Sequence, residues 1–169
     1  AVGLYHVENL TPEAKAQGEA LIREGAPVYV IDDAELERVK AGYPCVWKDL
    51  GASPKLCFVG CPHLTLGQLQ SWTERLEKSL RENGKTKVTV PTVFTAAPAT
   101  IKEFQKTVYA KRLERTGVIL SYICPLMYMN NPLSGKMPVI TCSNKLRTYT
   151  TARYYTEDEI LNKITGGAC

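Results

Sequence analysis

Residues 55–64, which read KLCFVGCPHL, are the stretch of this chain that decides its fold. Their first part, Lys55–Gly60, is a compact apolar run, typical of a strand that is buried on both faces of a sheet. A helix is predicted to follow from about Thr65 to Asn83. Its apolar residues recur three or four positions apart and form one stripe: Leu66, Leu69, Trp72, Leu76 and Leu80. A buried strand that leads into an amphipathic helix indicates an α/β fold.

The same alternation continues along the rest of the chain. The further predicted strands are Ala1–Val7, Pro27–Ile31, Lys87–Thr95, Val118–Ile123 and Val139–Thr141. The further predicted helices are Thr11 to about Gly25, Asp32 to about Gly42, Pro98–Gly117 with a break near Tyr109, and two that begin at Ser143 and Thr156. We therefore predict one α/β domain over residues 1–169, with a mostly parallel sheet and helices on both faces in three α/β/α layers.

Composition excludes several classes of protein. The 169 residues are 44% hydrophobic and 22% charged, a normal globular mix with a net charge of +4. The most basic stretch, Lys102 to Arg115, also carries Glu103 and Glu114 and lacks interleaved aromatic residues, so we interpret it as a solvated helix face and expect no nucleic-acid partner. No apolar run approaches the roughly 18 residues that span a bilayer, so we expect no membrane association.

The six cysteines are expected to be reduced. They are Cys45, Cys57, Cys61, Cys124, Cys142 and Cys169. Disulfide scaffolds are usually short and rich in loops, whereas this chain alternates long helices with apolar strands. We therefore expect a cytoplasmic protein in which some thiols pack in the core and some act as ligands.

Two Cys-Pro steps directly follow predicted strands, at Cys61 and at Cys124. Ligands of open α/β sheets bind beyond the carboxyl ends of the strands, and those ends converge in a parallel sheet. Proline restricts the preceding residue to extended geometry, which can direct a thiolate out of the sheet edge, and thiolates are the usual ligands of iron–sulfur clusters. The alternative is that both are buried structural cysteines. A zinc site is disfavoured, because the chain has no Cys-x-x-Cys pair and only two histidines, His6 and His63.

A third predicted strand end is suited to an anion. Ser143 and Asn144 lie where a helix begins, and Lys145 and Arg147 add positive charge, so these four residues are the candidate substrate-binding group. The alternative is an ordinary capped helix with solvated basic side chains. His63 is the candidate catalytic residue as a ligand, a proton carrier or a hydrogen-bond partner of the substrate, and a structural histidine that caps the long helix is the alternative.

Four segments resemble, in order, segments of the aconitase X family. They are LYHVE with TPEA (residues 4–8 and 11–14), GCPHLTL (60–66), CPLMYMNNP (124–132) and SNKLRTY (143–149). The resemblance covers nearly the whole chain. It implies an aconitase-like fold and places the chain in the C-terminal part of a large catalytic subunit more than twice this length.

The resemblance also implies an activity. Family members are hydro-lyases that dehydrate small hydroxy acids such as cis-3-hydroxyproline or phosphomevalonate, with an iron–sulfur cluster whose iron acts as a Lewis acid on the leaving hydroxyl group. By resemblance, Cys61 and Cys124 hold this metal cluster, and Cys169 is a candidate third ligand.

The resemblance further implies partners. A serine on a separate small subunit or domain is the base in the family, and the N-terminal part of the large subunit is absent here. We therefore expect the chain alone to be inactive and to hold no cluster. Cys142 stands where the family has Asn, which affects the anion pocket. The alternative function is a non-enzymatic α/β domain that binds an anion at the start of the Ser143 helix.

Overall fold

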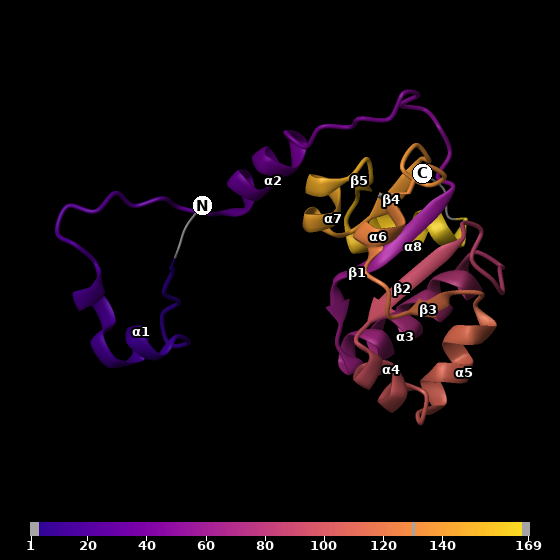
Figure 1. The fold of residues 1–169 in the computed structure, drawn as a ribbon, viewed down its shortest axis with the longest axis horizontal. Helices are drawn as coiled ribbons and strands as arrows, with labels where there is room; N and C mark the ends of the chain where they lie inside the picture. Colours follow the sequence, from indigo (N-terminus) through magenta and orange to yellow (C-terminus); the bar gives the residue numbers. More distant parts are fainter. Residues whose placement is uncertain (1–3, 130, 167–169) are drawn as a thin grey trace. The chain divides into compact units, whose positions relative to one another are not determined.

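The structure, a computed structural model, describes residues 4–129 and 131–166. The chain divides into two units, residues 1–42 and 43–169, and each is described by itself (Figure 1). All strands of the described sheet lie in the second unit. Among the described residues, no helix has the length and apolar character needed to cross a membrane.

The sheet has five strands in the order β3-β2-β1-β4-β5, and all neighbouring strands are parallel (Figure 1). Their bounds are β1 Leu56–Leu64, β2 Thr92–Ala96, β3 Ile119–Ser121, β4 Val139–Thr141 and β5 Arg153–Tyr154. Strand β1 is central, and its Phe58 lies opposite Val93 of β2 and Thr141 of β4. The predicted parallel sheet is therefore confirmed, with the 55–64 stretch at its centre.

Helices cover both faces of the sheet, as predicted. Cys57 and Val59 of β1 belong to one buried cluster, together with side chains of α3 (Leu66–Glu82), α4 (Pro98–Phe104), α5 (Val108–Arg115) and α8 (Glu157–Thr165). Phe58 points to the opposite cluster, which includes residues of α6 (Pro125–Met129) and α7 (Asn144–Tyr149). Successive strand residues point to opposite faces, so the apolar run of β1 fills both layers of the core.

The predicted stripe on α3 is confirmed. Leu69, Trp72, Leu76 and Leu80 are buried, and Leu66 packs partly buried against the same cluster. The helix begins at a capping box in which the Thr65 hydroxyl accepts from the Gln68 N–H at 3.2 Å and Gln68 Oε1 accepts from the Thr65 N–H at 2.9 Å. These contacts satisfy two N–H groups that the first helical turn leaves free.

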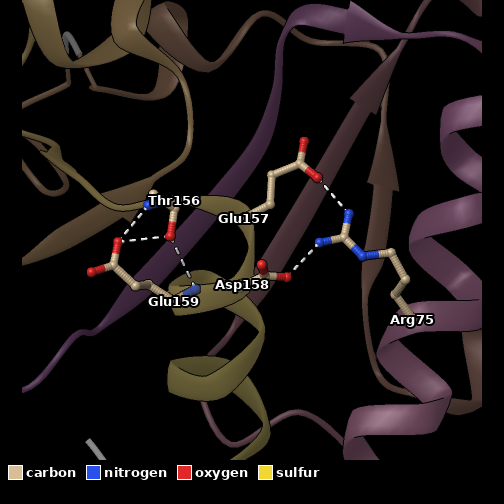
Figure 2. Close-up of polar contacts among 5 residues, drawn as sticks. All are labelled: Arg75, Thr156, Glu157, Asp158 and Glu159. Atoms are coloured by element: carbon tan, nitrogen blue, oxygen red, sulfur yellow. Dashed lines mark hydrogen bonds and ion pairs between the residues drawn. The ribbon is translucent and has the colours of Figure 1, made fainter. Parts of the chain in front are cut away.

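A polar contact joins α3 to the start of α8 (Figure 2). The Arg75 guanidinium forms an ion pair with Glu157 and lies 3.0 Å from Asp158 Oδ1. The same guanidinium lies 5.0 Å from the centre of the Trp72 ring. Thr156 caps α8, and the Glu159 carboxylate accepts from the Thr156 N–H at 2.7 Å.

The described part of the first unit contains three short helical segments, none with a buried residue: α1 (Pro12–Gln17), the 3-10 helix η1 (Gly18–Leu21) and α2 (Asp33–Ala41). Helix α2 confirms its prediction, and its N-cap Asp32 accepts from the Glu35 N–H at 2.8 Å. The first predicted helix also begins as expected, but its α-helical part ends at Gln17.

Two predicted strands are wrong in their described residues. Residues 4–7 and 27–31 pair with no strand of the described chain. A strand needs a neighbouring strand to receive its backbone hydrogen bonds, and residues 4–42 supply none to these segments. Their apolar side chains are exposed instead, Val28 to 88%. The prediction of a single domain over residues 1–169 stays a prediction.

Other boundaries also differ from the prediction. Strand β1 continues through the Cys-Pro turn to Leu64, and β2 begins only at Thr92, directly after Pro91, which lacks an N–H. Strand β5 was not predicted, because two residues show no periodicity. The predicted 98–117 helix is interrupted near Gln105–Thr107, slightly before the expected position.

Candidate functional site

Cys61 and Ser143 are brought together at the carboxyl end of the central strands. Phe58 of β1 lies opposite Thr141 of β4, so Cys61 and Ser143 follow that pair at the ends of neighbouring strands. The Ser143 hydroxyl donates a hydrogen bond to the Cys61 carbonyl oxygen. Two of the three predicted strand ends therefore converge, as expected for a parallel sheet.

Gly60 makes the turn before Cys61 possible. Its φ of +108° is a conformation that L side chains rarely adopt, and a Cβ atom at this position would lie 2.4 Å from the Thr95 carbonyl oxygen. The Thr95 hydroxyl donates to the Gly60 carbonyl at 2.5 Å. Pairing between β1 and β2 shifts register between Val59 and Leu64, and the Cys61-Pro62 peptide bond is cis.

Cys124 directly precedes helix α6, and its carbonyl accepts from the Met127 N–H at 2.9 Å. The Tyr128 ring of this helix stacks on Phe58 of β1, with ring centres 5.5 Å apart. Cys61 and Tyr128 both pack against the cluster that contains Phe58. The helix that begins after Cys124 therefore lies on the same face of β1 as Cys61.

The loop between β3 and Cys124 is held by a hydroxyl group. Ser121 Oγ accepts from the Ile123 N–H at 3.1 Å and lies 3.2 Å from the Tyr128 hydroxyl. Ser121 and Thr95 are not among the site residues predicted from the sequence. Only their position at the end of a strand distinguishes them in the sequence, and many serines and threonines share that position.

All five described cysteines are free, and the thiols of two of them, Cys57 and Cys142, have a raised pKa. Burial raises the pKa of the Cys57 thiol well above its usual value. Burial, with a smaller contribution from the Glu157 carboxylate, raises the pKa of the Cys142 thiol to about 12. Both thiols stay protonated near neutral pH, and a protonated thiol is a poor metal ligand.

Cys61 and Cys124 are half-buried and lie at the carboxyl edge of the sheet, each directly before a proline. Their soft sulfur atoms are chemically suited to an iron–sulfur cluster. Within residues 4–129 and 131–166, no three histidine, cysteine, aspartate or glutamate side chains are grouped closely enough to hold a metal ion. These two thiols therefore provide part of a ligand set, and the candidate third ligand Cys169 lies outside the described residues.

Three of the four residues of the predicted anion-binding group already interact with other residues of the chain. The Ser143 hydroxyl caps α7 by accepting from the Leu146 N–H at 3.0 Å, and its single proton goes to Cys61. The Arg147 guanidinium donates to Asn144 Oδ1 at 2.8 and 3.0 Å and stacks over the Tyr43 ring at 4.0 Å. Lys145 is exposed and forms no ion pair within the described residues.

His63 lies two residues beyond Cys61, near the end of β1, and it is exposed. It therefore does not cap the following helix, whose N-cap is Thr65. Its catalytic role stays a prediction.

Comparison with known proteins connects this geometry to a family. The sequence model of the aconitase X third domain matches residues 54–160, which include Cys61, Cys124 and the start of α7. This chain belongs to the aconitase X family. The matched region covers the whole described sheet of this aconitase X chain but not the first unit.

Two relatives show how much of an aconitase X protein this chain represents. It is 25% identical over 174 residues to the phosphomevalonate dehydratase large subunit of Methanosarcina mazei, an alignment that covers 99% of this chain and 38% of that protein. Its fold resembles the crystal structure of Thermococcus kodakaraensis aconitase X (holo-form), with a TM-score of 0.62, 20% identity, and coverage of 80% of this chain and 34% of the other. The chain thus spans less than two-fifths of each relative, and the second likeness shows the shared fold.

Proposed function

We propose that this chain forms the cluster-bearing and substrate-contacting part of a hydro-lyase that dehydrates a small hydroxy acid. The observation that supports this most directly is the position of Cys61 and Cys124. Both are free and half-buried, and the segments that carry them pack on one face of β1 at the carboxyl edge of the sheet. The family relationship adds the reaction class, because one relative is a dehydratase large subunit.

The reaction breaks a C–O bond and a neighbouring C–H bond. The hydroxyl oxygen leaves with the bonding electrons, a base takes the proton, and the C–H electron pair becomes the new C=C bond. An iron–sulfur cluster, when bound, would supply a Lewis acid for the leaving hydroxyl group. Cys61 and Cys124 would hold that cluster, and His63 could carry a proton at the same edge.

The substrate would be held by charge at the start of α7. Lys145 provides an exposed ammonium group, and Arg147 and Asn144 form a hydrogen-bonded pair beside it. A carboxylate or phosphate group of the substrate would be attracted to these two cations. Because the relative from Methanosarcina mazei is a phosphomevalonate dehydratase, we favour a phosphorylated hydroxy acid over cis-3-hydroxyproline.

The complete enzyme would need further partners. We propose that a small subunit or domain supplies the catalytic base, since the relative is called a large subunit, and that the remaining part of the large subunit completes the cluster site. The chain alone is therefore expected to show no turnover. We also propose a cytoplasmic location, because all five described cysteines are free.

A thiolate-ligation experiment tests the central proposal. Cobalt(II) gives a thiolate-to-metal charge-transfer band, and it can be titrated anaerobically into the large subunit that contains this chain, before reconstitution with iron and sulfide. Cys61→Ser and Cys124→Ser are each expected to weaken cobalt binding at least tenfold and to lose the band. Cys45→Ser is the matched control. It changes a half-buried thiol that packs against the apolar core on the opposite face of the sheet, and this variant should bind cobalt like the parent. Unchanged binding in both site variants would contradict the proposed function.

A further inference from the structure

Two consecutive carbonyl groups of the Cys61 turn are held by hydroxyl groups from opposite sides. The Gly60 carbonyl accepts from the hydroxyl of Thr95, which lies on β2. The Cys61 carbonyl accepts from the hydroxyl of Ser143, which directly follows β4 and Cys142. Since β2 and β4 are the two neighbours of β1 in the sheet, the turn is bound on both edges.

These hydroxyl groups act where the regular pairing of β1 stops. Pairing with β4 extends only to Phe58 and Thr141, and pairing with β2 shifts register after Val59. A backbone carbonyl that is left unpaired in a buried place is unfavourable, so the side-chain donors replace missing ladder bonds. Thr95 is fully buried, so its bond to the Gly60 carbonyl is shielded from water. Ser143 is 5% exposed and Cys61 is half-buried, so the bond between them is partly shielded.

Ser143 is itself fixed in place by two further bonds. Its hydroxyl accepts from the Leu146 N–H at 3.0 Å, and its own N–H donates to Thr141 Oγ1 at 3.1 Å. The end of β4, the first turn of α7 and the backbone of Cys61 are therefore linked through one side chain. Because a serine hydroxyl carries one proton and the Cys61 carbonyl receives it, Ser143 has no donor left for a substrate anion.

We propose that Thr95 and Ser143 are positioning residues that hold the Gly60–Cys61 backbone so that the Cys61 sulfur faces a metal cluster. Ser143 thereby acts on a metal ligand and is not a substrate ligand. The inference rests on the proposed function, in which Cys61 is a ligand. Residues that orient the metal-binding side chains strongly affect metal affinity, although they do not contact the metal themselves.

The test compares variants that keep or remove each hydroxyl group. Ser143→Ala and Thr95→Val are expected to lower cobalt(II) affinity at least tenfold and to shift the charge-transfer band. Ser143→Thr and Thr95→Ser, which retain a hydroxyl donor, should recover affinity to within about threefold of the parent, since effects of this kind span about 10- to 100-fold. After reconstitution with iron and sulfide, the reduction potential of the cluster should shift in Ser143→Ala and Thr95→Val but not in Ser143→Thr and Thr95→Ser.

Thr73→Val is the matched control. The Thr73 hydroxyl is also fully buried and also donates to a backbone carbonyl, that of Leu69 at 2.7 Å, but this hydrogen bond lies within α3. It should leave cobalt binding unchanged. If Cys61→Ser abolishes binding while Ser143→Ala and Thr95→Val bind like the parent, only this inference is overturned. If Cys61→Ser and Cys124→Ser also bind like the parent, the proposed function fails as well.

Discussion

Gly60 shows how one residue can determine a site. Its positive φ allows β1 to leave the regular ladder, and the absence of a side chain allows the Thr95 backbone to approach it closely. Glycine alone among the amino acids combines this backbone conformation with the absence of a side chain. The position of Cys61, the next residue, depends on them.

Gly60→Ala is therefore expected to destabilise the protein. A non-glycine residue in a disfavoured backbone region costs about 1–3 kcal/mol, and the contact with the Thr95 carbonyl adds to this cost. Gly67→Ala is the control, because its Cβ atom meets nothing within 4 Å and it lies in helix α3, where alanine is favoured by up to about 1 kcal/mol. Urea-induced unfolding measures both, and a Gly60→Ala variant as stable as the parent would show that the turn is not constrained in this way.

At the scale of elements, two contacts at the start of α8 are expected to differ in strength: the capping box of Thr156 and Glu159, and the ion pair of Asp158 with Arg75 (Figure 2). Thr156 and Glu159 exchange backbone and side-chain hydrogen bonds in a capping box. Asp158 also contacts Arg75, but its side chain is 89% exposed. Water and salt screen such an exposed ion pair, so it contributes little to the free energy of unfolding.

Thr156→Ala is expected to lower the free energy of unfolding by about 1 kcal/mol, the usual effect of losing an N-cap side chain. Asp158→Asn is expected to change it by less than about 0.5 kcal/mol. Chemical denaturation of the two variants under identical salt conditions gives the comparison. An equal or larger loss in Asp158→Asn would mean that the ion pair with Arg75, and not the capping box, joins α8 to the fold.

At the scale of the whole molecule, the two units differ in how they bury apolar residues. The second unit has a large core on both faces of its sheet. No residue from 4 to 42 of the first unit is buried, and the consecutive apolar residues Val28, Tyr29, Val30 and Ile31 are 68–88% exposed. The stability of the chain should therefore reside in the second unit.

Replacing both Val28 and Val30 by Asp is expected to leave the free energy of unfolding within about 0.5 kcal/mol of the parent, as for exposed positions generally. Leu76→Ala, by contrast, removes a fully buried side chain of α3 and should cost about 2–5 kcal/mol. Thermal unfolding followed by near-ultraviolet circular dichroism measures both. A large loss in the double variant would show that these residues contribute to the stability of the chain.

The sequence predicted the local elements best where the periodic signal is long. The stripe on α3 and the apolar run of β1 are examples, and both lie where expected. It failed for residues 27–31, whose composition is that of a strand, because a strand exists only where another strand accepts its hydrogen bonds. It also missed Thr95 and Ser121, whose hydroxyl partners are distant in sequence or formed only by the folded loop.

The sequence by itself determined the α/β alternation, the residues that follow each strand, and the family. Hydrophobic periodicity and local motifs are properties of neighbouring residues, so they can be identified along the chain. Only the tertiary structure decided that burial raises the pKa of the Cys57 and Cys142 thiols, and that Cys61 and Cys124 lie half-buried at the carboxyl edge of the sheet. Only it showed that the Ser143 hydroxyl is directed to the Cys61 carbonyl, 82 positions away. Burial and hydrogen-bond partners are set by contacts between distant segments, and those contacts exist only once the sheet has formed.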